Sequence, residues 1–361
     1  MPPPARRDLR NLVRKLGASA RPSQQVQALS ILVALVRASD EESATACAAA
    51  GAILSLVQLM GSGSPPDVQD SAAEVLAYLA DDPQHVGAIF AAGAIPVLVP
   101  LLRPASPSSL QESAVGALLG LSQDAACGVV IAGSGVIPPL VELLGPGTAH
   151  SLQRHASGAL MRLAAAADTA VAIAAAGAIP PLVRLLAADI PADVQQQAAG
   201  ALMHLTHKPA IADDIIAAGA VPPLVKLLLG GEGTRDGTLH NAAGALGNIA
   251  QTDAAARRIA AAGAIPPLVR LIEPGSSPGV RRKATTALYT LAVAPQNAFL
   301  IVEAGGLPQL VRLHLGQTGS DPNTKHFATR ALAAMGANGG PLIHKAIHLA
   351  LAGAQRAAPP S

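Results

Sequence analysis

The stretch "AAGAIPPLVRLL" occupies residues 175–186, and a near copy, "AAGAIPPLVRLI", occupies residues 261–272. In each copy a glycine precedes an apolar run that contains two prolines. Seven such glycines stand 42 or 44 residues apart: Gly51, Gly93, Gly135, Gly177, Gly219, Gly263 and Gly305. A fixed period of this length predicts stacked supersecondary units, because one such unit cannot bury its apolar face alone. The repeats therefore predict a solenoid.

The repeated stretch also predicts a corner between two helices. Glycine commonly ends a helix, because it adopts the left-handed conformation without steric cost. Proline is accepted in the first turn of the following helix, where it removes no needed hydrogen bond. After the glycine, apolar residues recur with the spacing of one helical face, as at Ile179, Leu182 and Val183. Each copy of the stretch is therefore expected to turn the chain at the same place in its unit.

A longer helix is predicted after each corner, for example over 195–205 ("QQQAAGALMHL") and 240–250 ("HNAAGALGNIA"). One column of this helix is always alanine: Ala72, Ala114, Ala156, Ala198, Ala242, Ala284 and Ala328. A second column is always leucine: Leu76, Leu118, Leu160, Leu202, Leu246, Leu288 and Leu332. Small residues allow neighbouring helices to approach closely, while leucine fills the space between them. Each unit should contain a short first helix, a second helix that begins with proline, and a long third helix.

The same register divides the chain into three parts. Residues 1–50 are expected to form a truncated amino-terminal capping repeat, and residues 51–334 an array of about seven repeats. Residues 335–361 should form a capping helix and a short tail. Pro100 falls inside the second helix of its repeat, where it is expected to kink or shorten that helix.

Composition excludes several classes of function. Aromatic residues make up 1% of the chain, so stacking platforms for nucleic-acid bases are nearly absent. The net charge of +2 gives no domain-wide field that would attract DNA. The two cysteines, Cys47 and Cys127, lie in apolar helical stretches and are interpreted as small buried residues rather than a disulfide framework. We expect no nucleic-acid partner.

Targeting signals are also not apparent. No uncharged apolar run of eighteen residues occurs, so no membrane span is expected. The first 39 residues are rich in Arg and Lys, as organelle transit peptides are, but they fit the helical register of the repeats. We therefore expect a cytoplasmic protein, with the nucleus as the alternative compartment, and no transit peptide.

No constellation of an acid, a base and a nucleophile is found, so the protein is not expected to be an enzyme or to need a cofactor. Two histidine pairs, His344 with His348 and His204 with His207, have helical spacing. Neither pair has a carboxylate or cysteine nearby in the sequence to complete a tetrahedral metal site. We expect no metal.

The repeats resemble those of armadillo (ARM) repeat proteins, whose units of similar length carry the pattern "AGAIPPLVxLL…AAGALxNLA". The resemblance covers nearly the whole chain. It implies an all-α armadillo-repeat solenoid, a right-handed superhelix of three-helix repeats, in which the third helices line a concave groove. In the family a ladder of asparagines on these helices binds the backbone of an extended peptide. The matching positions here read Ala34, Tyr78, Gly120, Arg162, His204, Asn248, Thr290 and Ala334.

This chain departs from the family's nuclear-import adaptors. These adaptors place Trp four residues before each ladder position, where this chain has Ser30, Glu74, Gly116, Gly158, Gly200, Gly244, Thr286 and Arg330. It therefore lacks the aromatic slots that hold lysine side chains. The row of four glycines has two interpretations: an open groove floor, or a family variant without a functional role. We expect no micromolar binding of a lysine-rich signal peptide.

Charge differs along the third helices. Asp67, Asp70, Glu74 and Glu112 lie on the early ones, whereas basic residues dominate later. This pattern is interpreted either as solvated surface or as a groove that orients a partner with acidic residues. The candidate protein-binding residues are Tyr78, Arg154, Arg162, His204, Asn248, Arg282, Lys283, Thr290 and Arg330.

These observations predict a non-enzymatic scaffold or adaptor. We expect it to be a monomer that binds an extended or helical segment of a partner protein in the groove. An importin-alpha-like nuclear-import adaptor is one alternative. A structural subunit of a larger assembly, such as a cytoskeletal one, is the other.

Overall fold

A computed structural model describes residues 6–17, 20–37, 45, 48, 51–61, 63–230, 235–317 and 321–356. Within these ranges every regular element is an α-helix, apart from one isolated bridge between Pro274 and Ser276. The chain divides into two compact units, Met1–Ala176 and Gly177–Ser361. The all-α solenoid class predicted from the repeats is confirmed. Cys47 lies outside the described residues.

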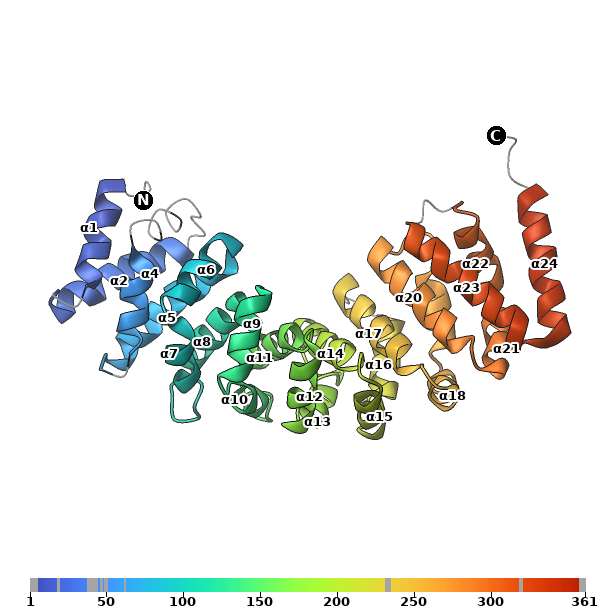
Figure 1. Ribbon diagram of the computed structural model, residues 1–361, viewed down its shortest axis with the longest axis horizontal. Helices are drawn as coiled ribbons and strands as arrows, with labels where there is room; N and C mark the ends of the chain where they lie inside the picture. Colours follow the sequence, from blue (N-terminus) through green and yellow to red (C-terminus); the bar gives the residue numbers. More distant parts are fainter. Residues whose placement is uncertain are drawn as a thin grey trace. The chain divides into compact units, whose positions relative to one another are not determined.

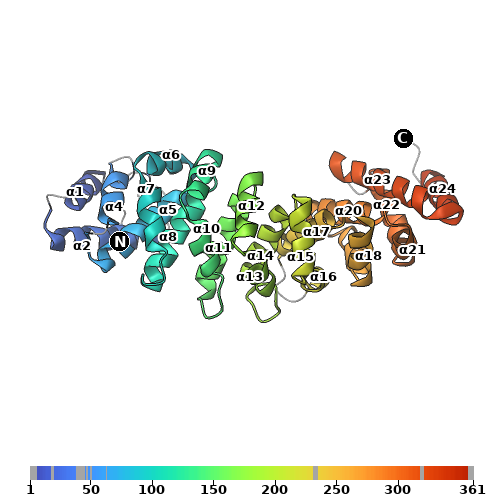
Figure 2. The ribbon, with the colours of Figure 1, turned by 60° about the horizontal axis from the view of Figure 1, so that its bottom comes forward.

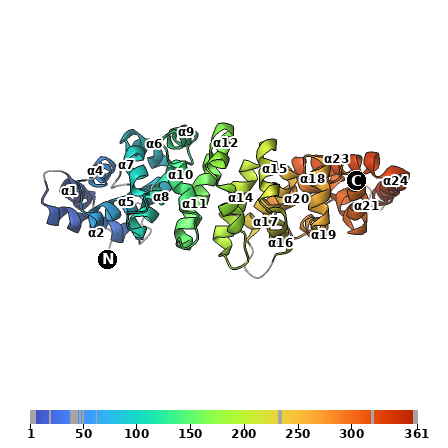
Figure 3. The same ribbon diagram turned by 90° about the horizontal axis from the view of Figure 1, so that it is seen from below.

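The first unit contains four predicted third helices, α2, α5, α8 and α11, which follow one another in Figure 1. Two short first helices, α6 and α9, lie along one edge of this unit in Figures 2 and 3. The helices of the unit are α1 (Arg6–Leu16), α2 (Pro22–Arg37), α4 (Ala52–Leu59), α5 (Pro66–Asp81), α6 (Pro83–Ala91), α7 (Ala94–Leu101), α8 (Ser108–Leu121), α9 (Ala125–Gly133), α10 (Ile137–Glu142), α11 (His150–Leu163) and α12 (Ala167–Ala175).

The second unit repeats the same order of short, proline-started and long helices. Its last helix, α24, packs against α22 and α23 (Figure 1). The helices of the unit are α13 (Ile179–Arg184), α14 (Ala192–Leu205), α15 (Pro209–Ala217), α16 (Val221–Leu229), α17 (Asp236–Ile249), α18 (Asp253–Ala261), α19 (Ile265–Leu271), α20 (Pro278–Leu291), α21 (Pro295–Glu303), α22 (Gly306–His314), α23 (Pro322–Asn338) and α24 (Gly340–Arg356).

The glycine corner forms at every predicted position. The seven glycines of the column all have positive φ values, between 75° and 90°. A residue with a Cβ is strained in this left-handed conformation, so glycine is required where each first helix ends. Proline occupies the first turn of α10, α13, α16 and α19, as expected.

Pro100 lies inside its helix as predicted, but the helix is not shorter than the next two second helices, and a kink stays a prediction. Its helix, α7, has eight residues, whereas α10 and α13 have six. Pro100 is the last residue but one of α7, so little of the helix lies after it. The chain then closes with a tighter turn, in which the Leu102 N–H donates to the Val99 carbonyl at 3.2 Å.

The alanine and leucine columns of the third helices form the core. All seven alanines have no exposed surface, and the leucines have none except Leu332, which is 5% exposed. Alanine lets adjacent third helices approach, and leucine fills the space between the layers. The truncated repeat at the amino terminus follows the same rule, since Ala28 and Leu32 of α2 are buried.

A column of glutamines, which sequence analysis did not single out, joins the second and third helices within one repeat. The Nε2 atom of each glutamine donates to a backbone carbonyl after the preceding helix, at 2.6–3.2 Å: Gln25 to Gly17, Gln69 to Gly61, Gln111 to Arg103, Gln153 to Gly145, and Gln195 to Ala187. Arg281 stands at the matching position of α20, but its Nη2 donates at 2.9 Å to the carbonyl of Ser276, next to the N-cap of its own helix. Each glutamine bond ties the start of a third helix to the turn that follows the second helix, whose carbonyl also accepts a backbone N–H within the turn.

Cys127 is buried in α9 as expected, and burial together with Asp124 raises the pKa of its thiol to about 11. The capping helix predicted near the carboxyl end is present as α24. Of the described helices, none is individually long and apolar enough to cross a membrane, although α6 and α7 together, across a bend of 91°, meet the length and composition criteria.

Two glycines of α8 provide a test of helix packing. A Cβ at position 120 would lie 2.6 Å from the carbonyl oxygen of Ala80, whereas one at position 116 would lie 3.5 Å from the Cβ of Ala77. Gly120→Ala should therefore destabilise the protein by about 1–3 kcal/mol through overpacking. Gly116→Ala should stabilise it by up to about 1 kcal/mol through helix propensity. Urea unfolding of both variants checks this, and a stabilised Gly120→Ala variant would contradict the close approach of α5 and α8.

The Leu202→Ala substitution tests whether layers act mainly on their neighbours. Removing this fully buried side chain should cost about 2–5 kcal/mol, because it leaves a cavity between α14 and the adjacent helices. Hydrogen exchange should show a greater loss of protection in α14 and α17 than in α23. An equal loss of protection in all helices of the second unit would contradict the idea that each layer mainly stabilises its neighbours.

Candidate functional site

The residues predicted to bind a partner lie on the third helices of both units. Tyr78, Arg154 and Arg162 belong to the first unit. The second unit holds His204, Asn248, Arg282, Lys283, Thr290 and Arg330. We describe each group within its own unit.

The first unit has a hollow of 460 Å³ on α5, α8 and their neighbours. Four carboxylates line it: Asp70, Glu74, Asp81 and Glu112. The predicted residue Tyr78 lies in the same lining. Sequence analysis noted acidic residues on the early third helices but did not predict that they share a hollow.

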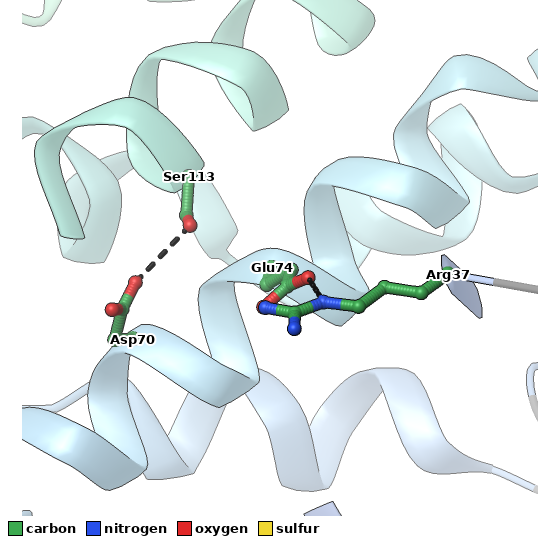
Figure 4. A network of polar contacts seen from close by, with 4 residues as sticks. All are labelled: Arg37, Asp70, Glu74 and Ser113. Atoms are coloured by element: carbon green, nitrogen blue, oxygen red, sulfur yellow. Dashed lines mark hydrogen bonds and ion pairs between the residues drawn. The ribbon is translucent and has the colours of Figure 1, made fainter. Parts of the chain in front are cut away.

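Hydrogen bonds between helices hold three of these carboxylates. The Ser113 hydroxyl donates to Asp70 at 3.2 Å (Figure 4). The Ser151 hydroxyl donates to Glu112 at 3.0 Å. Glu74 accepts two bonds from Arg37 of α2, at 2.6 and 3.0 Å, in the forked geometry typical of a guanidinium and a carboxylate (Figure 4). The acidic side chains are therefore positioned before any partner binds.

Arg154 and Arg162 lie within electrostatic reach of this acidic hollow. Partial desolvation raises the pKa of Asp81, and the positive charges of Arg162 and Arg154 oppose that rise. Arg154 also places its Nη2 atom 2.7 Å from the Nε2 atom of His155, which lines the hollow. The charge of these two arginines is thus partly balanced within the first unit, which was not expected from the sequence.

The second unit gathers four basic side chains, His204, His240, Arg282 and Lys283, which we call the Lys283 cluster. They come from three successive third helices, α14, α17 and α20. Burial lowers the pKa of His204, and the charges of His207 and Lys283 lower it further. Burial, Lys283 and Arg282 likewise lower the pKa of His240, against a backbone hydrogen bond to Gly279 that raises it. Lys283 also has a lowered pKa, because of burial and the charge of Arg282.

Two glycines make room for this cluster. A Cβ at position 244 would lie 3.4 Å from the Cδ of Lys283 and 2.5 Å from the Sδ of Met203. A Cβ at position 279 would lie 3.3 Å from the Nδ1 of His240. The interpretation of the glycine row as an open floor therefore does not hold at Gly244, where neighbouring side chains fill the space.

Asn248 and Thr290, the polar ladder residues of the second unit, make internal hydrogen bonds. The amide nitrogen of Asn248 donates to the Met203 carbonyl at 3.1 Å and to the Thr206 hydroxyl at 3.2 Å. The Thr290 hydroxyl donates to the Ala287 carbonyl at 2.9 Å. A peptide that accepted a hydrogen bond from the Asn248 amide nitrogen would have to displace these partners. The position of Asn248 in the sequence does not show these internal bonds.

Arg330 rests on an aromatic pair. Its guanidinium carbon lies 4.4 Å from the centre of the Tyr289 ring, and its Nη2 donates to the Tyr289 hydroxyl. The ring of Phe327 lies 6.2 Å from that of Tyr289. This cation–π contact orients an exposed arginine. The sequence offered one indication of this contact. Tyr289 and Arg330 stand 41 residues apart, close to one repeat period, which puts them at similar positions on neighbouring third helices.

The part of the chain that the structure describes holds no group of three His, Cys, Asp or Glu side chains arranged for a metal ion. His344 and His348, considered in the sequence, do contact each other, with Nε2 atoms 3.0 Å apart. Six of the predicted residues thus belong to two polar surfaces: Tyr78, Arg154 and Arg162 lie in or near the acidic hollow, and His204, Arg282 and Lys283 belong to the basic cluster. Asn248, Thr290 and Arg330 belong to neither.

Comparisons with known proteins identify the repeats. The family model for the armadillo/beta-catenin-like repeat matches residues 82–122, 167–207, 208–251 and 253–293. A crystal structure of an engineered protein is 33% identical, with a TM-score of 0.82, over 95% of this chain and 81% of the engineered one. No curated protein sequence matches the chain significantly.

Two designed armadillo repeat proteins are also similar. One is 28% identical, with a TM-score of 0.59, over 66% of this chain and 99% of its own length. The other was solved in complex with the peptide (KR)4 and is 27% identical, with a TM-score of 0.58, over 67% of this chain and 99% of its own. Together with the glycine corners and the three-helix repeats, these matches show that the chain belongs to the armadillo-repeat family.

Proposed function

We propose that this protein is a non-enzymatic scaffold whose third helices bind a segment of a partner protein, and that the Lys283 cluster of the second unit binds acidic residues of that segment. A designed armadillo repeat protein of similar structure binds a peptide, which supports the general role. The Lys283 cluster is the observation that carries the choice of an acidic segment.

The cluster has more positive than negative charge. Among the described residues, neither Arg282 nor Lys283 forms an ion pair. Asp321 is the carboxylate that lies within electrostatic reach, since the charge of Arg282 contributes to lowering its pKa. Burial and mutual repulsion make this arrangement unfavourable in the free protein. Acidic side chains of a partner would relieve the repulsion, and arginine can hold a carboxylate through two hydrogen bonds.

The Arg282→Glu/Lys283→Glu variant tests this function. The wild-type protein should select peptides rich in Asp and Glu from a random peptide library, and binding should weaken as salt is added. The variant should bind the selected peptides at least about tenfold more weakly, because each lost charged hydrogen bond contributes about 1.5–3 kcal/mol. Fluorescence anisotropy measures the affinities.

A matched control is Arg258→Glu/Arg270→Glu, which changes the net charge equally. Both arginines are exposed, on α18 and α19, away from the third helices. The control should bind acidic peptides nearly as well as the wild type. Equal weakening of both variants would mean that overall charge, and not the cluster, determines binding.

The acidic hollow of the first unit favours a second candidate function, the binding of a basic segment. Its four carboxylates already hold one guanidinium, that of Arg37 on Glu74. The designed armadillo protein that binds (KR)4 makes a basic peptide chemically reasonable. The absence of tryptophan from the sequence opposes the import-adaptor version of this candidate.

Calorimetry with a (KR)4 peptide distinguishes the two candidates. Because the aromatic slots are missing, we expect the wild-type protein to bind this peptide more weakly than micromolar. The Asp70→Asn/Glu112→Gln variant should lose even that weak binding, since it removes two charges from the hollow. Micromolar binding by the wild type that this variant abolishes would establish the basic-segment function instead.

A further inference from the structure

We propose that the Lys283 cluster binds a phosphate monoester carried on the partner segment. This inference rests on the proposed function, because it specifies which acidic group the cluster recognises.

The cluster is assembled by side chains that cross between helices. Lys283 starts on α20, and its aliphatic stem passes over Gly244 of α17, where the missing Cβ leaves room. Its charge acts on His204 of α14 and on His240 of α17. The ring of His240 in turn lies against Gly279, at the start of α20. The Lys283 stem therefore lies beside α17, and the His240 ring lies beside the start of α20, where Arg282 and Lys283 are carried.

Basic side chains act on both histidines. Lys283 and His207 act on His204, while Lys283 and Arg282 act on His240. On the side of α23, Asp321 lies within reach of Arg282. Within the described residues, no carboxylate contributes to the lowered pKa values of the two histidines or of Lys283. In the free site the charges of Arg282 and Lys283 therefore stand near two histidines whose pKa values are lowered.

A phosphate monoester fits this site better than a single carboxylate does. It carries a charge of about −1.5 to −2 and three acceptor oxygens, whereas a carboxylate carries one charge and two oxygens. The dianion can accept bonds from Arg282 and Lys283 and still leave oxygens for both histidines. Protonated histidine donates from both ring nitrogens, so protonation adds donors as well as charge.

The direction of the proton coupling follows from linkage. The pKa values of both histidines lie below the ordinary value of about 6.5 in the free protein, and a bound dianion raises them. Protons are therefore taken up on binding, and affinity rises as the pH falls from about 8 toward 6.5. Below about pH 6 the phosphate itself gains a proton, so the rise should stop there.

The test measures histidine ring signals by NMR in the full-length protein, with an acidic octapeptide that carries phosphoserine, Glu or Ser at its centre. The phosphoserine peptide should bind at least about tenfold more tightly than the Glu peptide and raise the pKa of His204 and His240. His344 and His348, on α24, should not respond and serve as internal references. Calorimetry in buffers of different ionisation enthalpy should show proton uptake.

The Lys283→Met variant provides the site-specific control, with Lys226→Met on α16 as its match. Without peptide, Lys283→Met should raise the pKa of both histidines, because a repelling charge is gone. It should also lose the preference for phosphoserine, whereas Lys226→Met should retain it. If Lys283→Met is unstable, Arg282→Gln should reduce the same preference.

Three outcomes would overturn the proposal: equal binding of the phosphoserine and Glu peptides, unchanged histidine pKa values, or inorganic phosphate binding as tightly as the phosphoserine peptide. The first two outcomes exclude the phosphate site. The third means that the cluster binds free inorganic phosphate rather than a phosphorylated partner segment. Equal binding of phosphoserine and Glu peptides would leave the scaffold function intact. Failure of every acidic peptide to bind would instead contradict the proposed function.

Discussion

The left-handed glycine at each corner is the constraint on which the rest of the structure depends. Seven glycines hold φ values between 75° and 90°, so the chain enters each second helix from the same backbone conformation. Only then can the alanine and leucine columns of successive third helices meet in register. Burial stabilises the layers, but the backbone conformation at the corners determines which faces are buried.

Close packing of the third helices also shapes the polar surfaces. Where a column residue is glycine, a neighbouring helix supplies the atoms that fill the gap. Gly120 admits the backbone of Ala80, and Gly244 admits the side chains of Met203 and Lys283. The second case brings a lysine within reach of histidines on other helices. Glycine packing and the basic cluster thus meet at one place, since Gly244 makes room for Met203 and contacts the stem of Lys283.

Much of the fold could be predicted from the sequence, because it depends on local periodicity. The corners, the buried columns and the cap helices α1, α2 and α24 lie where the register places them. The candidate site was less predictable, since it depends on contacts between repeats. The register places Asn248 on a third helix but does not show that its amide bonds to Met203. Similarly, it lists Asp70 and Glu112 without showing that they share a hollow.

The glutamine column has a consequence for how such a chain can grow. Each of its bonds, such as Gln111 to Arg103 and Gln153 to Gly145, joins two helices of the same repeat and needs no other layer. A duplicated repeat would therefore bring its own glutamine hydrogen bond as well as its own glycine corner. Tandem duplication in the gene can lengthen the array without any new turn chemistry, and deletion of whole periods can shorten it. Selection is then free to vary the charges on the third helices from one copy to the next.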